Sequence, residues 1–302
     1  MSIQTQRMQT WKLFAATLVF SLGTLILGAP FIRLFRNMKG SAIFWSLGVL
    51  TTGTLWLLNF QALAILFSAI WVTIGLQVEF EIKKWTLWSS GVLATSLGFV
   101  FSAFLSVLLL AQKKMLSVDA IKLLFEQFSQ QLKQIYPQQG FDTSELLFQT
   151  PSVFAVFLII TLAMGLVFEK RVLLYFSNTQ NLESSFKKAI AQKQKLLGFK
   201  IPEYLIWPAL LSILLSLPNL ANDQVSIAAV NVMNIFVCIF FLQGLAVLES
   251  VFLFFRAGFL IRLCVFLFIF SYLFLVISAL GLIDYWVDIR NRLKKSSAAK
   301  PN

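Results

Sequence analysis

Residues 41–76 read SAIFWSLGVLTTGTLWLLNFQALAILFSAIWVTIGL, a run of 36 residues that contains no charged side chain. One crossing of a bilayer needs about 20 mainly apolar residues in a helix, so this run is too long for a single span. Asn59 and Gln61 interrupt it near the middle. The stretch therefore predicts two membrane helices joined by a tight turn.

The rest of the chain has a matching composition. Of its 302 residues 58% are hydrophobic and only 13% are charged, and the mean hydropathy is +0.81. A water-soluble core of this chain length cannot bury that much apolar surface. We therefore expect an all-α protein, a polytopic transmembrane helix bundle in contact with the lipid bilayer.

Apolar runs bounded by charge, proline or glycine predict about eight spans. They cover residues 11–29, 41–58, 61–78, 86–111, 151–168, 203–218, 226–255 and 258–283. Pro30, Pro151 and Pro218 stand at predicted helix ends, whereas Pro208 lies inside the sixth span and predicts a kink. No soluble part can be separated, so residues 1–302 are expected to form a single membrane domain.

Two connections between the spans predict amphipathic helices, at 117–136 and at 181–197. In the first, apolar residues recur at helical spacing among charged and amide side chains. In the second, Phe186 and Ile190 lie beside several lysines. We expect both helices to lie in the membrane interface; docking on a partner protein is the alternative.

The charges and reactive side chains exclude several function classes. The formal net charge is +12, but the Lys and Arg residues flank apolar runs, which is typical of topology signals and contacts to anionic lipid rather than nucleic acid. The absence of His from the sequence excludes His-based catalysis and most catalytic zinc sites. Cys238 and Cys264 both fall within apolar spans. We expect no cofactor, no metal and no enzyme activity.

Polar residues inside a span are the default functional candidates, because they cost free energy in lipid unless they are paired. Asn231, Asn234 and Glu249 share one stripe of the seventh predicted span at 100° per residue, and Gln243 points about 120° away from Asn231 as a weaker member. The four could line a binding cavity for a small polar or cationic solute. They could equally join helices through hydrogen bonds, each worth about 0.6–2 kcal/mol in membranes, and Glu249 could pair with Arg256.

Small residues recur on the fourth predicted span, which allows close approach of another helix. They are Gly91, Ala94, Gly98, Ser102 and Ser106. The other helix could belong to this chain or to a second membrane subunit.

Charged residues follow the last span, and Trp286 is expected to anchor them at headgroup depth. Asp288 and Arg292 have the favourable i,i+4 order of an acid before a base. A salt-bridge network at the interface is therefore favoured over a metal site. We assign to it Arg256, Arg262, Asp284, Asp288, Arg290 and Arg292.

Three segments carry a family resemblance. Gly281, Asp284, Trp286, Asp288 and Arg290 resemble the closing signature of the YybS family of bacterial polytopic membrane proteins, and segments 201–207 and 241–247 resemble two further motifs of that family. Its helices are similar to the substrate-binding S components of energy-coupling-factor vitamin transporters. The resemblance implies a bacterial cytoplasmic (inner) membrane, a solute cavity among the C-terminal helices, and docking of a transmembrane coupling subunit served by ATPases.

Two functions remain open. The leading hypothesis is a solute-binding transporter subunit, with Asn231, Asn234, Glu249 and less surely Gln243 as contacts. The alternative is a non-catalytic membrane scaffold that recruits partners through its interfacial helices. An intramembrane enzyme is third, because only Glu249, Asp284 and Asp288 offer acid–base chemistry.

Overall fold

The computed structural model describes residues 3–115, 143–176, 199–217, 222–255 and 274–298, with isolated positions in 117–134 and at 220. All regular structure in these parts is helical, as composition predicts. The chain divides into two compact units, Met1–Leu182 and Glu183–Asn302, and each is described by itself. Arg256, Arg262, Pro218, the helix predicted at 181–197 and most of the one at 117–136 lie outside the described residues.

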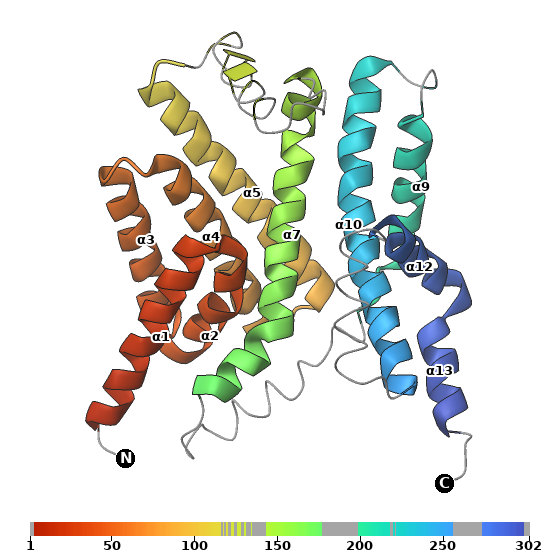
Figure 1. The fold of residues 1–302 in the computed structure, drawn as a ribbon, viewed down its shortest axis with the longest axis horizontal. Coiled ribbons are helices and arrows are strands. Elements are labelled where there is room, and N and C mark those ends of the chain that lie inside the picture. The colour runs from red at the N-terminus through yellow and green to blue at the C-terminus, as the bar shows by residue number, and fades with distance from the viewer. Residues whose placement is uncertain are drawn as a thin grey trace. The chain divides into compact units, whose positions relative to one another are not determined.

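The first unit begins with a helix that breaks and turns back into the unit (Figure 1). We expected one span at 11–29, but α1 ends at Gly23, the turn η1 (Leu25–Gly28) follows, and Pro30 lies in the first turn of the separate helix α2. Proline favours this position because its missing N–H needs no helical partner there. The α-helices described in this unit are α1 (Ile3–Gly23), α2 (Ala29–Lys39), α3 (Ser41–Leu57), α4 (Gln61–Ile82), α5 (Leu87–Gln112) and α7 (Thr143–Phe176).

Helix α2 is short and buried. Its 11 residues span about 16 Å at 1.5 Å per residue, roughly half of a hydrocarbon layer about 30 Å thick. It packs against α7, α4 and α1, and seven of its residues are buried, among them Arg33 and Arg36. Two arginines are therefore held inside the first unit rather than at its surface.

The uncharged stretch forms a helical hairpin, α3 and α4, whose turn places Asn59 in the left-handed region at φ 62°. On the next hairpin the small residues of α5 face α4, where Ala94, Gly98 and Ser102 are buried. A Cβ on Gly98 would lie 3.1 Å from the carbonyl oxygen of Ala69 and closer still to the Thr73 hydroxyl. This part of the stripe thus packs against another helix of the same chain.

The second unit contains one long helix crossed by a shorter one. A Cβ on Gly244 would meet the Ile277 carbonyl oxygen, and one on Gly281 would meet that of Phe240, each at 2.0 Å. The two backbones can approach so closely only because both positions are glycine. The helical elements are η3 (Glu203–Leu205), α9 (Ile206–Leu215), α10 (Asp223–Phe254), α12 (Phe274–Val287) and α13 (Ile289–Ala298).

Two proline predictions need correction. Pro151 was expected at a helix end, but α7 runs through it from Thr143 to Phe176; membrane helices tolerate proline where neighbouring groups satisfy the freed carbonyl. Pro208 was expected to kink a helix, but α9 begins at Ile206, so Pro208 lies in the first turn, where no helical hydrogen bond is lost.

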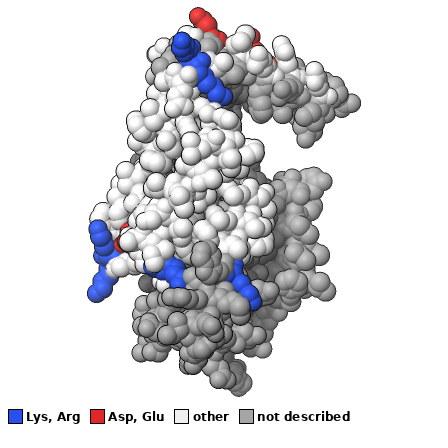
Figure 2. Space-filling model, turned by 90° about the vertical axis from the view of Figure 1, so that its left-hand side faces the viewer, with Lys and Arg blue, Asp and Glu red and all other residues white. Residues whose placement is uncertain are grey.

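Four described helices are long and apolar enough to cross a membrane: Gln61–Ile82, Leu87–Gln112, Phe148–Glu169 and Asp223–Phe252. Shorter apolar helices occupy Lys12–Gly23, Ser41–Leu57, Glu203–Leu215 and Phe274–Val287. Figure 2 shows a broad uncharged surface with Lys and Arg gathered towards its two ends, the pattern of a belt that faces lipid. The total of eight spans stays a prediction.

Candidate functional site

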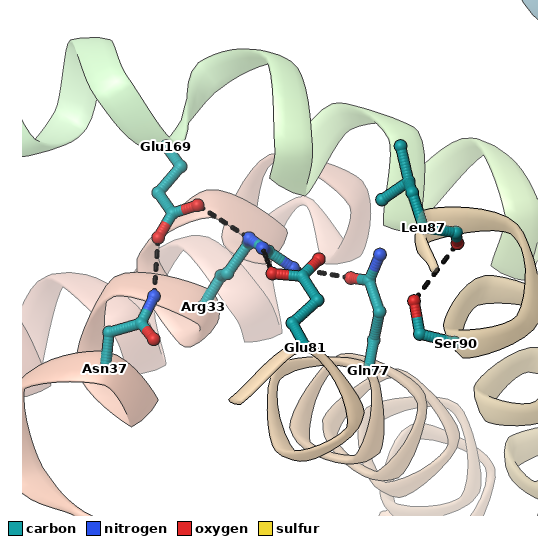
Figure 3. A network of polar contacts seen from close by, with 7 residues as sticks. All are labelled: Arg33, Asn37, Gln77, Glu81, Leu87, Ser90 and Glu169. Carbon is teal, nitrogen blue, oxygen red and sulfur yellow. Dashed lines mark hydrogen bonds and ion pairs between the residues drawn. The ribbon is translucent and has the colours of Figure 1, made fainter. Parts of the chain in front are cut away.

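The largest buried charged group in the first unit surrounds Arg33 of α2 (Figure 3). Its Nε donates to Glu169 of α7 at 2.6 Å, its Nη1 to Gln77 of α4 at 2.5 Å and its Nη2 to Glu81 of α4 at 2.5 Å. Asn37 Nδ2 donates to the second oxygen of Glu169 at 2.6 Å. We call these five residues the Arg33 cluster.

Local helix geometry explains the cluster. Arg33 and Asn37 are four residues apart on α2, and Gln77 and Glu81 are four apart on α4, so each pair lies on one helix face. Arg33 is fully buried. Burial lowers the pKa of Arg33, but the charges of Glu169 and Glu81 outweigh this, so its pKa is raised above the ordinary value and it remains charged.

A second ion pair lies beside the cluster, nearer the surface. Arg36 Nη2 donates to Glu79 Oε1 at 2.5 Å, and Ser41 Oγ donates to the same oxygen at 2.6 Å. The Glu79 side chain is 23% exposed, whereas that of Arg33 is 0% exposed. The two pairs therefore offer the same chemistry at different degrees of burial.

The Arg33 cluster joins three helices by groups that satisfy one another. Removing two charges from water costs several kcal/mol per ion, and only good geometry with further hydrogen bonds offsets it. The buried Gln77 Nε2 is among the cluster atoms that have no hydrogen-bond partner within the described residues. We interpret the cluster as the connection that fixes α2 to α4 and α7.

Sequence reasoning missed this cluster. Its acids and Arg33 stand at the ends of apolar runs next to Lys83, Lys84 and other bases, where charges are usually topology signals. The available signal was the presence of Glu81 and Glu169 at such ends, because acids are uncommon among positive flanking charges.

In the second unit the Gln243 side chain is completely buried, and both the oxygen and the nitrogen of its amide form hydrogen bonds. Its Oε1 accepts from the backbone N–H of Ile201 at 3.0 Å, and its Nε2 donates to the Gly281 carbonyl at 2.9 Å. The side chain thus connects α10 to α12 and to the segment before η3. It was ranked weakest of the four solute candidates, yet its contacts are those of a helix-joining group.

The other three candidates occupy half-buried positions of α10. Asn231 Nδ2 donates to the carbonyl of Ile227 in its own helix at 3.0 Å. Asn234 and Glu249 also take part in polar or ring contacts. Their role as solute contacts stays a prediction.

The charged segment after α12 contains a buried ion pair. Arg290 Nη2 lies 2.9 Å from Asp284 Oδ2, and Nη1 donates to the Phe199 carbonyl at 2.7 Å. Asp288 has a left-handed φ of 49° between α12 and α13, and its carboxylate accepts from Asn291 at 2.6 Å. Arg292 is exposed, and its backbone N–H bonds the Asp288 carbonyl.

A cavity of about 180 Å³, partly open to the surface, lies among α9, α10 and α12. Ala209, Ile213, Met233 and Phe240 are among its lining residues, and Ser278 is the single polar one. The Ser278 hydroxyl is bonded to the carbonyls of Val237 and Phe274, so the cavity is effectively apolar. None of the four solute candidates lines it. We call it the C-terminal cavity.

The described residues contain no group of three or more His, Cys, Asp or Glu side chains placed to hold a metal ion. Among the described residues of the second unit, the C-terminal cavity is an apolar space.

Comparison with known proteins places the chain only coarsely. The family model described as "Predicted membrane protein (DUF2232)" matches residues 13–285. No curated protein matches, and no solved structure does either. The finer resemblance, to the YybS family and to S components, stays a prediction.

Proposed function

This chain belongs to the DUF2232 family of predicted membrane proteins, and from that premise we propose that it is a non-catalytic membrane subunit that binds a solute with an apolar part. The observation that carries the proposal is the C-terminal cavity among α9, α10 and α12. A transport-type role agrees with the resemblance to S components, which implies a solute cavity among the C-terminal helices.

The buried charged and amide groups named above support this choice because each of them binds another group of the chain. The Arg33 cluster binds its own members, Gln243 bonds two backbone groups, and Asp284 pairs with Arg290. A catalytic acid or base needs to reach a substrate proton, and these groups reach one another instead. The C-terminal cavity is an unfilled apolar space among the described residues of the second unit.

Photo-labelling tests the proposal. The full chain in nanodiscs is exposed to a diazirine-bearing fatty acid, and labelled peptides are identified by mass spectrometry. We expect labels on cavity residues such as Met233, and we expect Ala279→Trp, which fills the cavity from α12, to remove them. Ala228→Trp is the matched control, because Ala228 is an exposed alanine of α10 outside the cavity.

Uniform labelling of every lipid-facing helix, unchanged in the Ala279→Trp variant, would refute solute binding at this cavity. The scaffold hypothesis would then lead. It depends on the helices predicted at 117–136 and 181–197, and deletion of their charged faces followed by cross-linking in native membranes would test it. The same cross-linking would reveal a transmembrane coupling subunit if one docks here.

A further inference from the structure

The C-terminal cavity needs a polar contact nearby if it is to prefer one occupant. Lipid tails are as apolar as its lining, so a hydrophobic effect cannot favour a solute over an ordinary acyl chain inside the bilayer. Selectivity must come from a headgroup held at one end of the cavity. Its surroundings therefore indicate what it binds.

Aromatic residues lie close in the chain to two of the residues that line the cavity. Leu282 lines the cavity, and Tyr285 and Trp286 follow on the next turn of α12. Trp207 stands two residues before the lining residue Ala209 on α9. Trp207 is 75% exposed and Trp286 58% exposed. Exposed Trp and Tyr side chains beside an apolar run are typical of headgroup depth.

Lys200 lies beside one of these aromatic residues, Tyr285. Lys200 Nζ is 5.9 Å from the centre of the Tyr285 ring, within the range of a cation–π contact, and Lys200 is exposed. Among the described residues no carboxylate pairs with it, whereas the neighbouring Arg290 pairs with Asp284. Lys200 thus lies beside Tyr285, which stands one helical turn after the lining residue Leu282 on α12.

Building on the proposed function, we propose that the solute is an anionic phospholipid, with part of one acyl chain in the C-terminal cavity and its phosphate-bearing headgroup on Lys200. The positive charge of Lys200 complements the anion, and the aromatic residues set the headgroup level. The occupant is then an amphipath taken from the surrounding leaflet rather than a water-soluble metabolite.

Lipid titration with native mass spectrometry tests this. The purified full chain is titrated with phosphatidylglycerol and with phosphatidylcholine that carry identical acyl chains. One lysine near anionic headgroups corresponds to a preference of about fivefold. We expect this preference for phosphatidylglycerol in the wild type, its loss in Lys200→Gln, and its recovery in Lys200→Arg. Lys113→Gln, a change of an exposed lysine at the end of α5, should keep it.

Two filling variants separate this inference from the proposed function. Ala279→Trp and Leu275→Trp alter exposed cavity residues and should abolish binding of both lipids. If they do so while Lys200→Gln keeps the full preference, the headgroup assignment is wrong and solute binding stands. If neither filling variant weakens either lipid, both the inference and the proposed function are wrong.

Discussion

Replacing Arg33 by Met should strongly destabilise the first unit. The variant keeps an apolar stem but leaves Glu81 and Glu169 facing each other without their shared cation. Breaking a buried ion pair by removing one partner costs about 3–5 kcal/mol, against a total stability of about 5–15 kcal/mol for a typical domain. We therefore expect most of the folded population to be lost under mild denaturation.

Arg36→Met is the matched control. Its partner Glu79 is 23% exposed, so water can solvate the remaining carboxylate, and the expected cost is about 1 kcal/mol. Both variants are unfolded by denaturant in detergent micelles and followed by tryptophan fluorescence. Trp71 reports on this unit because it stacks on Phe44 and lies within 6.3 Å of Phe35 of α2.

The combined variant Arg33→Met, Glu81→Gln, Glu169→Gln completes the test. Neutralising both acids removes the uncompensated charge, so the combined variant should regain at least half of the lost stability. Equal losses in Arg33→Met and Arg36→Met, or no recovery in the combined variant, would refute the argument that burial decides the cost.

Three further outcomes are expected. Gly281→Ala should cost about 1–3 kcal/mol or more, because its Cβ would overlap a backbone carbonyl of α10. Gly91→Ala, in open space on α5, should be neutral or slightly stabilising. Thermal unfolding compares the two variants, and similar melting temperatures would contradict this expectation. Gln243→Met should leave the buried backbone N–H of Ile201 unpaired, at about 1–3 kcal/mol, and remove the bond to the Gly281 carbonyl. It should also speed proteolysis near Ile201; unchanged proteolysis would count against the bridge. Lys84→Gly should raise the free energy of unfolding by up to about 1 kcal/mol, because Lys84 has the left-handed φ of 63° that glycine adopts without strain. Lys83→Gly, at φ −75°, should lower it. A less stable Lys84→Gly than Lys83→Gly would be inconsistent with the turn.

The sequence was sufficient where structure depends on local spacing. The charge-free stretch predicted a hairpin, and its turn lies at Asn59, the polar residue that interrupts the run and that adopts left-handed φ readily. The positions of proline predicted helix ends less reliably. Pro151 and Pro30 have identical backbone restrictions, yet one lies within a helix and the other opens one, because the outcome depends on the neighbouring segments.

The buried polar groups could not be placed from one sequence. Arg33 and Glu169 are 136 residues apart, and no local periodicity relates them. Helical periodicity gives the direction of Gln243 relative to Asn231 on α10, but it does not tell on which side of α10 the helix α12 crosses. The crossing is set by Gly244 and Gly281 together, a pair that only tertiary structure brings into contact.

The long sequence separation between Arg33 and Glu169 also orders events during synthesis. Ribosomes make α2 well before α7, so the arginine has no full set of carboxylate partners when its helix first leaves the insertion machinery. A chain released before residue 169 should keep α2 open to aqueous thiol reagents at an introduced cysteine. Insertion of this protein thus finishes late, when a helix from the middle of the chain arrives to neutralise one near its start.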